Sequence, residues 1–129
     1  MDDNCLVSFA FEARKQAYSP YSNFAVGAAL LDSDGKVFVG CNVENISFGL
    51  TICAERVALG AAIAAGSRTF TCIAIVSDSE EPVSPCGACR QVLAEFAPNL
   101  RIVSANLTGD RAELSLGELL PRASTGILG

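Results

Sequence analysis

The chain has 129 residues, half of them hydrophobic and 18% charged, which is typical of one folded domain. Its net charge of -5 at pH 7 argues against a broad binding surface for duplex nucleic acid, which needs excess lysine and arginine. The opening residues, Met1 to Asn4, lack the positive charge of a signal peptide, and no apolar run approaches the length of a bilayer span. We therefore expect a cytoplasmic protein with one domain, residues 1–129, that binds neither nucleic acid nor membrane.

The first half of the chain predicts a helix followed by a hairpin. Apolar residues recur at helical spacing over residues 5–17. Residues 24–31 and 37–41 predict two strands, joined by the turn Asp32-Ser33-Asp34-Gly35. Residues 42–52 have no clear period and contain Asn, Ser and Gly, so we expect a loop long enough to carry function.

The second half predicts alternating helices and strands. Residues 54–65 are apolar on most of the helical circumference and end at Gly66, which predicts a central, buried helix. Strand, helix, strand and helix are then expected over residues 73–77, 86–96, 100–105 and 115–120. This alternation predicts an α/β fold of three layers, α/β/α, around a central mixed sheet.

The strongest chemical signal is Cys53-Ala54-Glu55 together with Pro85-Cys86-Gly87-Ala88-Cys89. Each group lies at the predicted start of a helix. Two thiolates in a C-x-x-C pattern reach one cation, and a third cysteine would leave one tetrahedral position free. Three protein ligands with an open position are the pattern of catalytic zinc, and thiolates favour zinc over magnesium or calcium. We predict a zinc site made by Cys53, Cys86 and Cys89.

Charged neighbours fit this site. The partial positive charge of a helix N-terminus stabilises thiolates. Three thiolates and Zn²⁺ sum to a charge of about -1, and Arg56 and Arg90, which follow the two cysteine groups, are candidates to donate hydrogen bonds to the sulfurs. Glu55 is positioned to take a proton from metal-bound water and pass it to a substrate nitrogen.

Other interpretations of the cysteines remain open. Cys86 and Cys89 alone would fit a redox dithiol, but a thiol oxidoreductase leaves Cys53 and Glu55 unexplained. A zinc-binding interaction module without enzymatic activity would normally need a fourth protein ligand, and the chain has no histidine to supply one. The remaining cysteines have no matching partners and are expected to be free thiols: Cys5, Cys41 and Cys72.

The pattern C-A-E…P-C-G-A-C is the Cys₃ variant of the zinc deaminase signature H-x-E…P-C-x-x-C. Over nearly its whole length the chain resembles the small, homotetrameric cytidine deaminases. Further matching segments are Tyr18-Ser19-Pro20-Tyr21-Ser22-Asn23-Phe24, Val26-Gly27-Ala28-Ala29-Leu30, Gly40-Cys41-Asn42-Val43-Glu44-Asn45, Thr51-Ile52-Cys53-Ala54-Glu55-Arg56 and Gln91-Val92-Leu93.

This resemblance implies a function in pyrimidine salvage: hydrolytic deamination of cytidine or 2′-deoxycytidine, a small-molecule substrate, by a zinc-dependent homotetramer. It implies that Cys53, Cys86 and Cys89 hold zinc and that Glu55 is the catalytic proton shuttle. It further implies that Phe24 lies against the pyrimidine ring and that backbone groups at Ala54 and near Ser84 recognise the base edge. The ribose hydroxyls would be bound by Asn42 and Glu44.

Three positions depart from the family pattern. Ile46 replaces the usual Ala, Phe48 replaces a Tyr that helps hold the sugar end of the nucleoside, and Ser124 replaces a Phe that helps close a neighbouring active site. An alternative substrate is therefore a modified aminopyrimidine nucleoside, such as a blasticidin-like antibiotic.

Overall fold

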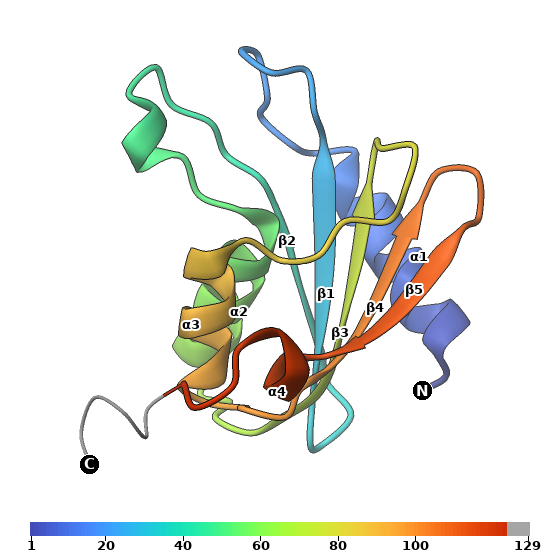
Figure 1. Ribbon diagram of the computed structural model, residues 1–129, viewed down its shortest axis with the longest axis vertical. Coiled ribbons are helices and arrows are strands. Elements are labelled where there is room, and N and C mark those ends of the chain that lie inside the picture. Colours follow the sequence, from blue (N-terminus) through green and yellow to red (C-terminus); the bar gives the residue numbers. More distant parts are fainter. Residues whose placement is uncertain (124–129) are drawn as a thin grey trace.

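The computed structural model describes residues 1–123, which form a five-stranded sheet with helices on both faces (Figure 1). In chain order the elements are α1 (Asp3–Arg14), β1 (Val26–Asp32), β2 (Val37–Cys41), the 3₁₀ turn η1 (Phe48–Leu50), α2 (Ala54–Ala64), β3 (Phe70–Ser77), α3 (Gly87–Ala94), β4 (Arg101–Asn106), β5 (Arg111–Ser115) and α4 (Leu116–Leu119). The strand order is β2-β1-β3-β4-β5, with β3 and β4 parallel and the other neighbours antiparallel. The predicted mixed sheet is confirmed.

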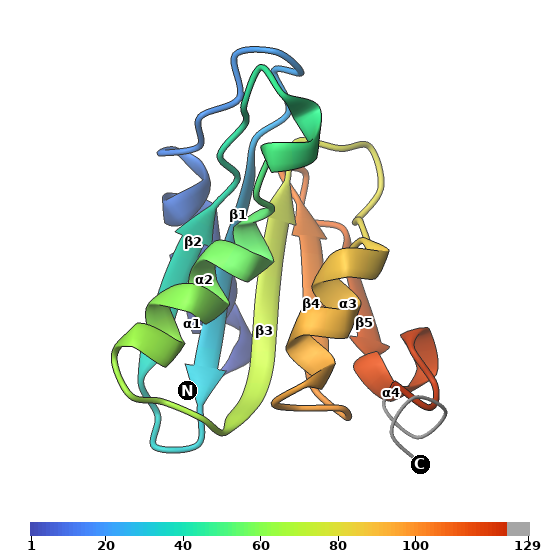
Figure 2. The ribbon, with the colours of Figure 1, turned by 90° about the vertical axis from the view of Figure 1, so that its left-hand side faces the viewer.

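The helices divide between the two faces of the sheet, which confirms the predicted three layers. Helix α1 packs on one face, where Leu6 and Ala10 are buried against alternate residues of β1, β3 and β4. Helices α2 and α3 lie side by side on the other face (Figure 2). There, Ala58, Leu59 and Leu93 join the apolar residues of the same strands that point the other way. Burial on both faces explains why β3 is almost continuously apolar.

Two glycines let the helices approach the sheet closely. A Cβ atom at Gly27 would lie 2.0 Å from the carbonyl oxygen of Ala10 in α1, so β1 passes this helix backbone against backbone. On the other face, a Cβ atom at Gly40 of β2 would lie 2.4 Å from the backbone nitrogen of Ala58 in α2. Any larger residue would push the helix away. The second contact matters most for function, because it fixes how α2 lies on the sheet.

The sequence analysis is wrong at one strand and inexact at helix ends. It predicts no strand at residues 111–115, where β5 pairs with β4 at the sheet edge after a turn at Gly109, whose φ is +95°. An edge strand with alternating charged residues lacks the apolar run that indicates a buried strand. The first helix begins at Asp3 rather than residue 5, because the Asp2 side chain accepts from the Cys5 backbone nitrogen at 2.8 Å. None of the helices in residues 1–123 is long and apolar enough to cross a membrane.

Candidate active site

The starts of α2 and α3 bring three cysteines together. Cys53 is the N-cap of α2, Cys86 is the N-cap of α3, and Cys89 follows in the first turn of α3. The Sγ atoms of Cys53 and Cys86 are 3.8 Å apart, and those of Cys86 and Cys89 are 3.5 Å apart. All three sulfurs lie within 4.8 Å of one another. The two motifs, more than thirty residues apart in sequence, therefore form one cluster.

The dimensions of the cluster fit a tetrahedral zinc ion. With Zn–S bonds of about 2.3 Å, two corners of a tetrahedron lie about 3.8 Å apart. The sulfur separations of 3.8 and 3.5 Å match this edge within a few tenths of an ångström. In residues 1–123 no further His, Cys, Asp or Glu joins the cluster. Three thiolates with a free fourth position suit a catalytic metal rather than a structural one.

Arg56 adds positive charge to the cluster. Its Nη2 atom lies 3.7 Å from Cys53 Sγ and 3.5 Å from the Thr51 carbonyl oxygen, while its buried Nε atom has no hydrogen-bond partner within residues 1–123. The contact with the Cys89 thiol, followed by that with Arg56, lowers the pKa of Cys53, and the same pairing raises the pKa of Cys89. The contacts with Cys89 and Arg56 therefore favour the thiolate form of Cys53.

Glu55 is a buried carboxyl beside the cysteines. It lies in the first turn of α2, two residues after Cys53, and its side chain is only 5% exposed. Burial raises the pKa of Glu55, and the nearby Cys53 sulfur raises it further. A carboxyl group with a raised pKa both accepts and releases protons closer to neutral pH, which is the property a proton shuttle needs.

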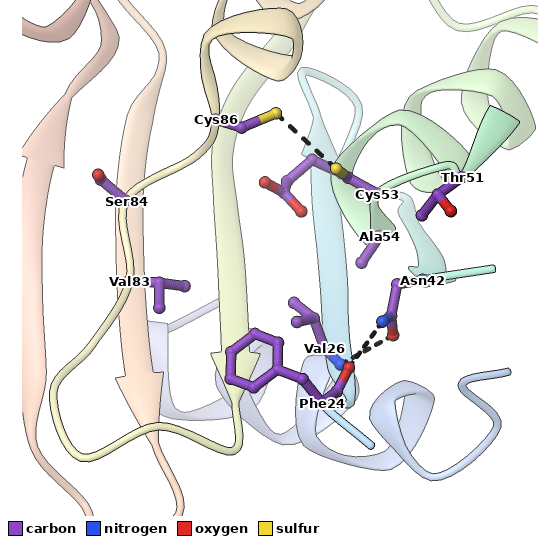
Figure 3. Close-up of a pocket in the computed structure, with 10 residues that line it drawn as sticks. Phe24, Val26, Asn42, Thr51, Cys53, Ala54, Val83, Ser84 and Cys86 are labelled. Atoms are coloured by element: carbon purple, nitrogen blue, oxygen red, sulfur yellow. Dashed lines mark hydrogen bonds between the residues drawn. The ribbon is translucent and has the colours of Figure 1, made fainter. Parts of the chain in front are cut away.

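A cavity of about 300 Å³ opens beside Cys53 and Cys86 (Figure 3). Glu55 also lines this cavity. Most of its wall surface is apolar, and several polar groups face it from different sides, which is the usual character of a small-molecule site. The residues that line it are Phe24, Val26, Asn42, Thr51, Cys53, Ala54, Glu55, Val83, Ser84 and Cys86. The cavity therefore extends from the three-cysteine cluster to Phe24, Asn42 and Ala54. The family resemblance implies that these three residues bind substrate.

Asn42 fixes the backbone where β1 begins, from Phe24 to Val26. Its side-chain oxygen accepts from the Val26 backbone nitrogen at 2.9 Å, and its side-chain nitrogen donates to the Phe24 carbonyl oxygen at 2.7 Å (Figure 3). These two bonds fix the backbone on both sides of Phe24, whose ring lines the cavity. Asn42 is itself largely buried.

Glu44 lies in an adjoining hollow instead of the main cavity. It accepts hydrogen bonds from the backbone nitrogens of Tyr21 and Ser22 at 3.0 and 3.2 Å, and from the Ser22 hydroxyl. The Ser22 contact lowers the pKa of Glu44, which favours the charged form. The hollow is lined by Tyr21, Ser22, Glu44, Phe48 and Thr51, and Thr51 also lines the main cavity.

Of the three positions that depart from the family pattern, Phe48 lines this hollow at the outer end of the site. Phe48 is 77% exposed and meets the Tyr21 ring edge-on at a centroid distance of 6.3 Å. Ile46 is 80% exposed. Ser124 lies outside the described residues.

Arg90 makes contacts that the sequence analysis did not anticipate. Its predicted role is to donate to a ligand sulfur, yet its three donor nitrogens bond to Ser84, Pro85 and Leu119. The structure therefore brings Arg56 to the sulfurs and turns Arg90 away from them. Arg90 adjoins Cys89 in sequence, so its side chain leaves the helix about 100° around the axis from that cysteine.

Comparisons of the sequence and the structure with known proteins show the family of this chain. Residues 1–105 match the model of the cytidine and deoxycytidylate deaminase zinc-binding region. The chain belongs to this family. A curated cytidine deaminase of Halalkalibacterium halodurans is 52% identical over 97% of this chain and 96% of its own length. Another, of Sporosarcina psychrophila, is 50% identical over 95% of this chain and 91% of its own length. The crystal structure of cytidine deaminase from Burkholderia pseudomallei superposes with a TM-score of 0.91 at 54% identity, over 94% of this chain and 98% of that one.

Family membership identifies zinc as the cofactor, in agreement with the dimensions of the three-cysteine cluster. The cavity also contains residues that the sequence analysis did not single out, namely Val26, Thr51 and Val83. Val26 was detectable in principle, because it lies two residues after Phe24 and side chains two apart share a strand face. Thr51 and Val83 come from loops without a period, so only the fold reveals them.

Proposed function

We propose that the protein hydrolytically deaminates cytidine and 2′-deoxycytidine to uridine and 2′-deoxyuridine, releasing ammonia. The observation that carries the proposal is the convergence of three cysteine sulfurs and a buried glutamate on one mostly apolar cavity. The names of the 52% and 50% identical relatives support the choice of a cytosine nucleoside as substrate.

In this proposal Cys53, Cys86 and Cys89 hold the metal. When bound, zinc supplies the Lewis acidity that makes water nucleophilic near neutral pH. Arg56, whose Nη2 atom is 3.7 Å from Cys53 Sγ, offsets part of the negative charge of the thiolates.

Glu55 moves the protons. Its carboxylate takes a proton from the attacking water and delivers it to N3 of the cytosine ring as the water oxygen adds to C4. It then carries the proton of the new C4 hydroxyl to the C4 amino group, so that the C4=O bond forms as the C–N bond breaks and ammonia leaves. The buried position of Glu55 supports this role, since a carboxyl with a raised pKa exchanges protons readily in both directions.

The remaining cavity residues orient the nucleoside. The Phe24 ring offers an apolar face for the pyrimidine, and backbone groups at Ala54 and Ser84 meet the base edge. Asn42 and Glu44 serve the ribose hydroxyls. In support, the Asn42 amide and the Glu44 carboxylate each hydrogen-bond to the loop that ends at Phe24. The two residues that bind the sugar would therefore also fix the position of the Phe24 ring.

We further propose that residues 1–129 act as one catalytic domain of a cytoplasmic homotetramer. A site of three thiolates requires reduced cysteines, which the cytosol maintains. The segment 43–52 exposes five large apolar side chains that an assembly would cover: Val43, Ile46, Phe48, Leu50 and Ile52. Light scattering at micromolar concentration tests the assembly, and a monomeric mass would contradict it.

The substrate is tested by measuring ammonia release from a panel of aminopyrimidine nucleosides. Cytidine and 2′-deoxycytidine should be the preferred substrates by kcat/KM. The alternative, a modified nucleoside such as a blasticidin-like antibiotic, is favoured by the hollow beside Phe48, which adjoins the sugar end of the cavity. Turnover of such a compound without turnover of cytidine would replace the proposed substrate.

A further inference from the structure

Arg90 of α3 uses all three of its guanidinium nitrogens on one side of the active site. Nε donates to the Pro85 carbonyl oxygen at 2.7 Å, and Nη2 donates to the Ser84 hydroxyl at 3.1 Å. Nη1 donates to the Leu119 carbonyl oxygen at 3.1 Å, at the end of α4. A planar guanidinium holds these three acceptors in a fixed relative geometry, which a single-point donor such as lysine does not do.

Two of these acceptors belong to the loop that forms one wall of the cavity. Val83, Ser84 and Cys86 all line it. Figure 3 shows the Ser84 hydroxyl pointing away from Phe24. Arg90 therefore contacts the loop on the side opposite Phe24, and the other side of the loop faces the cavity. A further hydrogen bond fixes the same loop, because the Ser104 hydroxyl of β4 donates to the Val83 carbonyl oxygen at 2.6 Å.

We propose that Arg90 is a positioning residue for deamination: it sets the wall formed by residues 83–86 and links that wall to the end of α4. The inference rests on the proposed function. Pro85 leads directly into Cys86, so the bond to the Pro85 carbonyl fixes the distance between the wall and the cysteine cluster. A bound base that touches the wall is thereby held at a defined distance from the zinc site and from Glu55.

The position of the wall affects the reacting geometry more than the stability of the fold. Ser84 is exposed and Leu119 is half-buried, so water reaches these two acceptors when Arg90 is changed, and only the carbonyl of the buried Pro85 loses its donor at a cost to the fold. A displacement of about 1 Å at a reacting centre, by contrast, costs up to about 100-fold in rate. Arg90→Gln should lower kcat/KM for the preferred substrate about 10- to 100-fold, with kcat falling more than KM rises. Arg90→Lys should lose nearly as much, because it keeps the charge but not the three-way geometry.

Gln91→Ala is the matched control. Gln91 is on the same helix and its Nε2 donates to the Ala123 carbonyl oxygen at 3.3 Å, so it also ties the chain after α4 to α3. Its side chain has no hydrogen bond to residues 83–86 among those of the described residues. Gln91→Ala should keep kcat/KM within about twofold, while Arg90→Gln should not. Equal losses of kcat/KM in Gln91→Ala and Arg90→Gln would show that Arg90 only attaches the C-terminal segment to α3, and would overturn the proposal.

The experiment compares wild type, Arg90→Gln, Arg90→Lys, Ser84→Ala and the double variant Ser84→Ala/Arg90→Gln, with rates expressed per bound zinc. The double variant should lose no more than Arg90→Gln alone, because Arg90 acts in part through Ser84. Hydrogen exchange should quicken at the backbone amides of Val83, Ser84 and Cys86 in both Arg90 variants. Unchanged kcat in a folded Arg90→Lys protein, or strictly additive losses, would refute the role. Wild-type turnover tests the proposed function separately, and if cytidine fails, the ratios are measured with whichever nucleoside the wild type deaminates.

Discussion

The N-terminal turns of α2 and α3 begin alike and then diverge. Both have a cysteine at the N-cap, Cys53 and Cys86, where the helix dipole favours a thiolate. Two residues further on, α2 has the buried Glu55, while α3 has the exposed Ala88. At the third position α2 has Arg56 and α3 has Cys89. The start of α2 therefore supplies one sulfur, an acid and a cation, and the start of α3 supplies two sulfurs and no charge.

The difference shows how one local structure serves two tasks. Side chains three apart lie on the same side of a helix, so the third position returns to the side of the N-cap cysteine. In α3 that return places Cys89 Sγ 3.5 Å from Cys86 Sγ and completes the proposed ligand set. In α2 it places Arg56 Nη2 3.7 Å from Cys53 Sγ, where the charge balances the thiolates. In the proposed mechanism, acid–base catalysis is therefore concentrated at α2 and metal binding at α3.

The largest effect is expected from removing the N-cap sulfur of α2. Cys53→Ser leaves two cysteines, and a serine hydroxyl is a poor zinc ligand because it stays protonated. Bound zinc should fall well below one per chain by elemental analysis, and turnover should fall about 10⁴-fold or more together with the metal. Cys5→Ser is the control, because Cys5 is an exposed free thiol on α1. Full zinc occupancy in Cys53→Ser would remove Cys53 from the ligand set.

Glu55→Gln separates acid–base work from metal binding. Glutamine keeps the size of the buried side chain but cannot carry a proton. Turnover should fall about 10²–10⁴-fold, the usual contribution of general acid–base catalysis, while zinc content and unfolding temperature stay close to wild type. Near-normal kcat with full zinc content would contradict the role of Glu55 as the proton shuttle.

A smaller effect distinguishes the two arginines. Arg56→Gln removes the donor beside Cys53 and should weaken zinc binding about 10- to 100-fold in a competition with a chelator. Arg90→Gln should leave zinc affinity within about twofold, because Arg90 donates to oxygen atoms instead of sulfur. If the two variants lose zinc equally, the division of tasks between the helix starts is wrong.

The smallest effect concerns the outer end of the site, where Phe48 meets Tyr21. Phe48→Tyr restores a hydroxyl, and a hydrogen bond to a neutral partner is worth about 0.5–1.5 kcal/mol, or about 2- to 10-fold in binding. The variant should raise the preference for cytidine over 5′-deoxycytidine by that factor in kcat/KM. An unchanged ratio would show that residue 48 does not face the sugar.

Spacing and periodicity predicted the parts of this molecule that depend on local chemistry. The two cysteine motifs indicated zinc because a C-x-x-C pair together with a third cysteine followed by an acid matches a catalytic zinc site, whereas C-x-x-C alone also fits a redox dithiol. The apolar runs were sufficient to predict β3 and β4. The direction of Arg90 was not predictable, because its acceptors include Leu119, which is distant in sequence. The hollow around Glu44 likewise depends on how residues 21–22 fold back over it. Edge strand β5 was missed because half-exposed strands lack an apolar run.

The central claim is that three thiolates and Glu55 form one zinc-dependent deaminating site. The most direct test is the change in ultraviolet absorbance as cytidine becomes uridine, followed in the purified protein, after removal of metal by a chelator, and after return of zinc. We expect conversion in the first sample, its loss in the second, and recovery in the third at about one zinc per chain. Full conversion of cytidine by protein shown to be free of metal would contradict it.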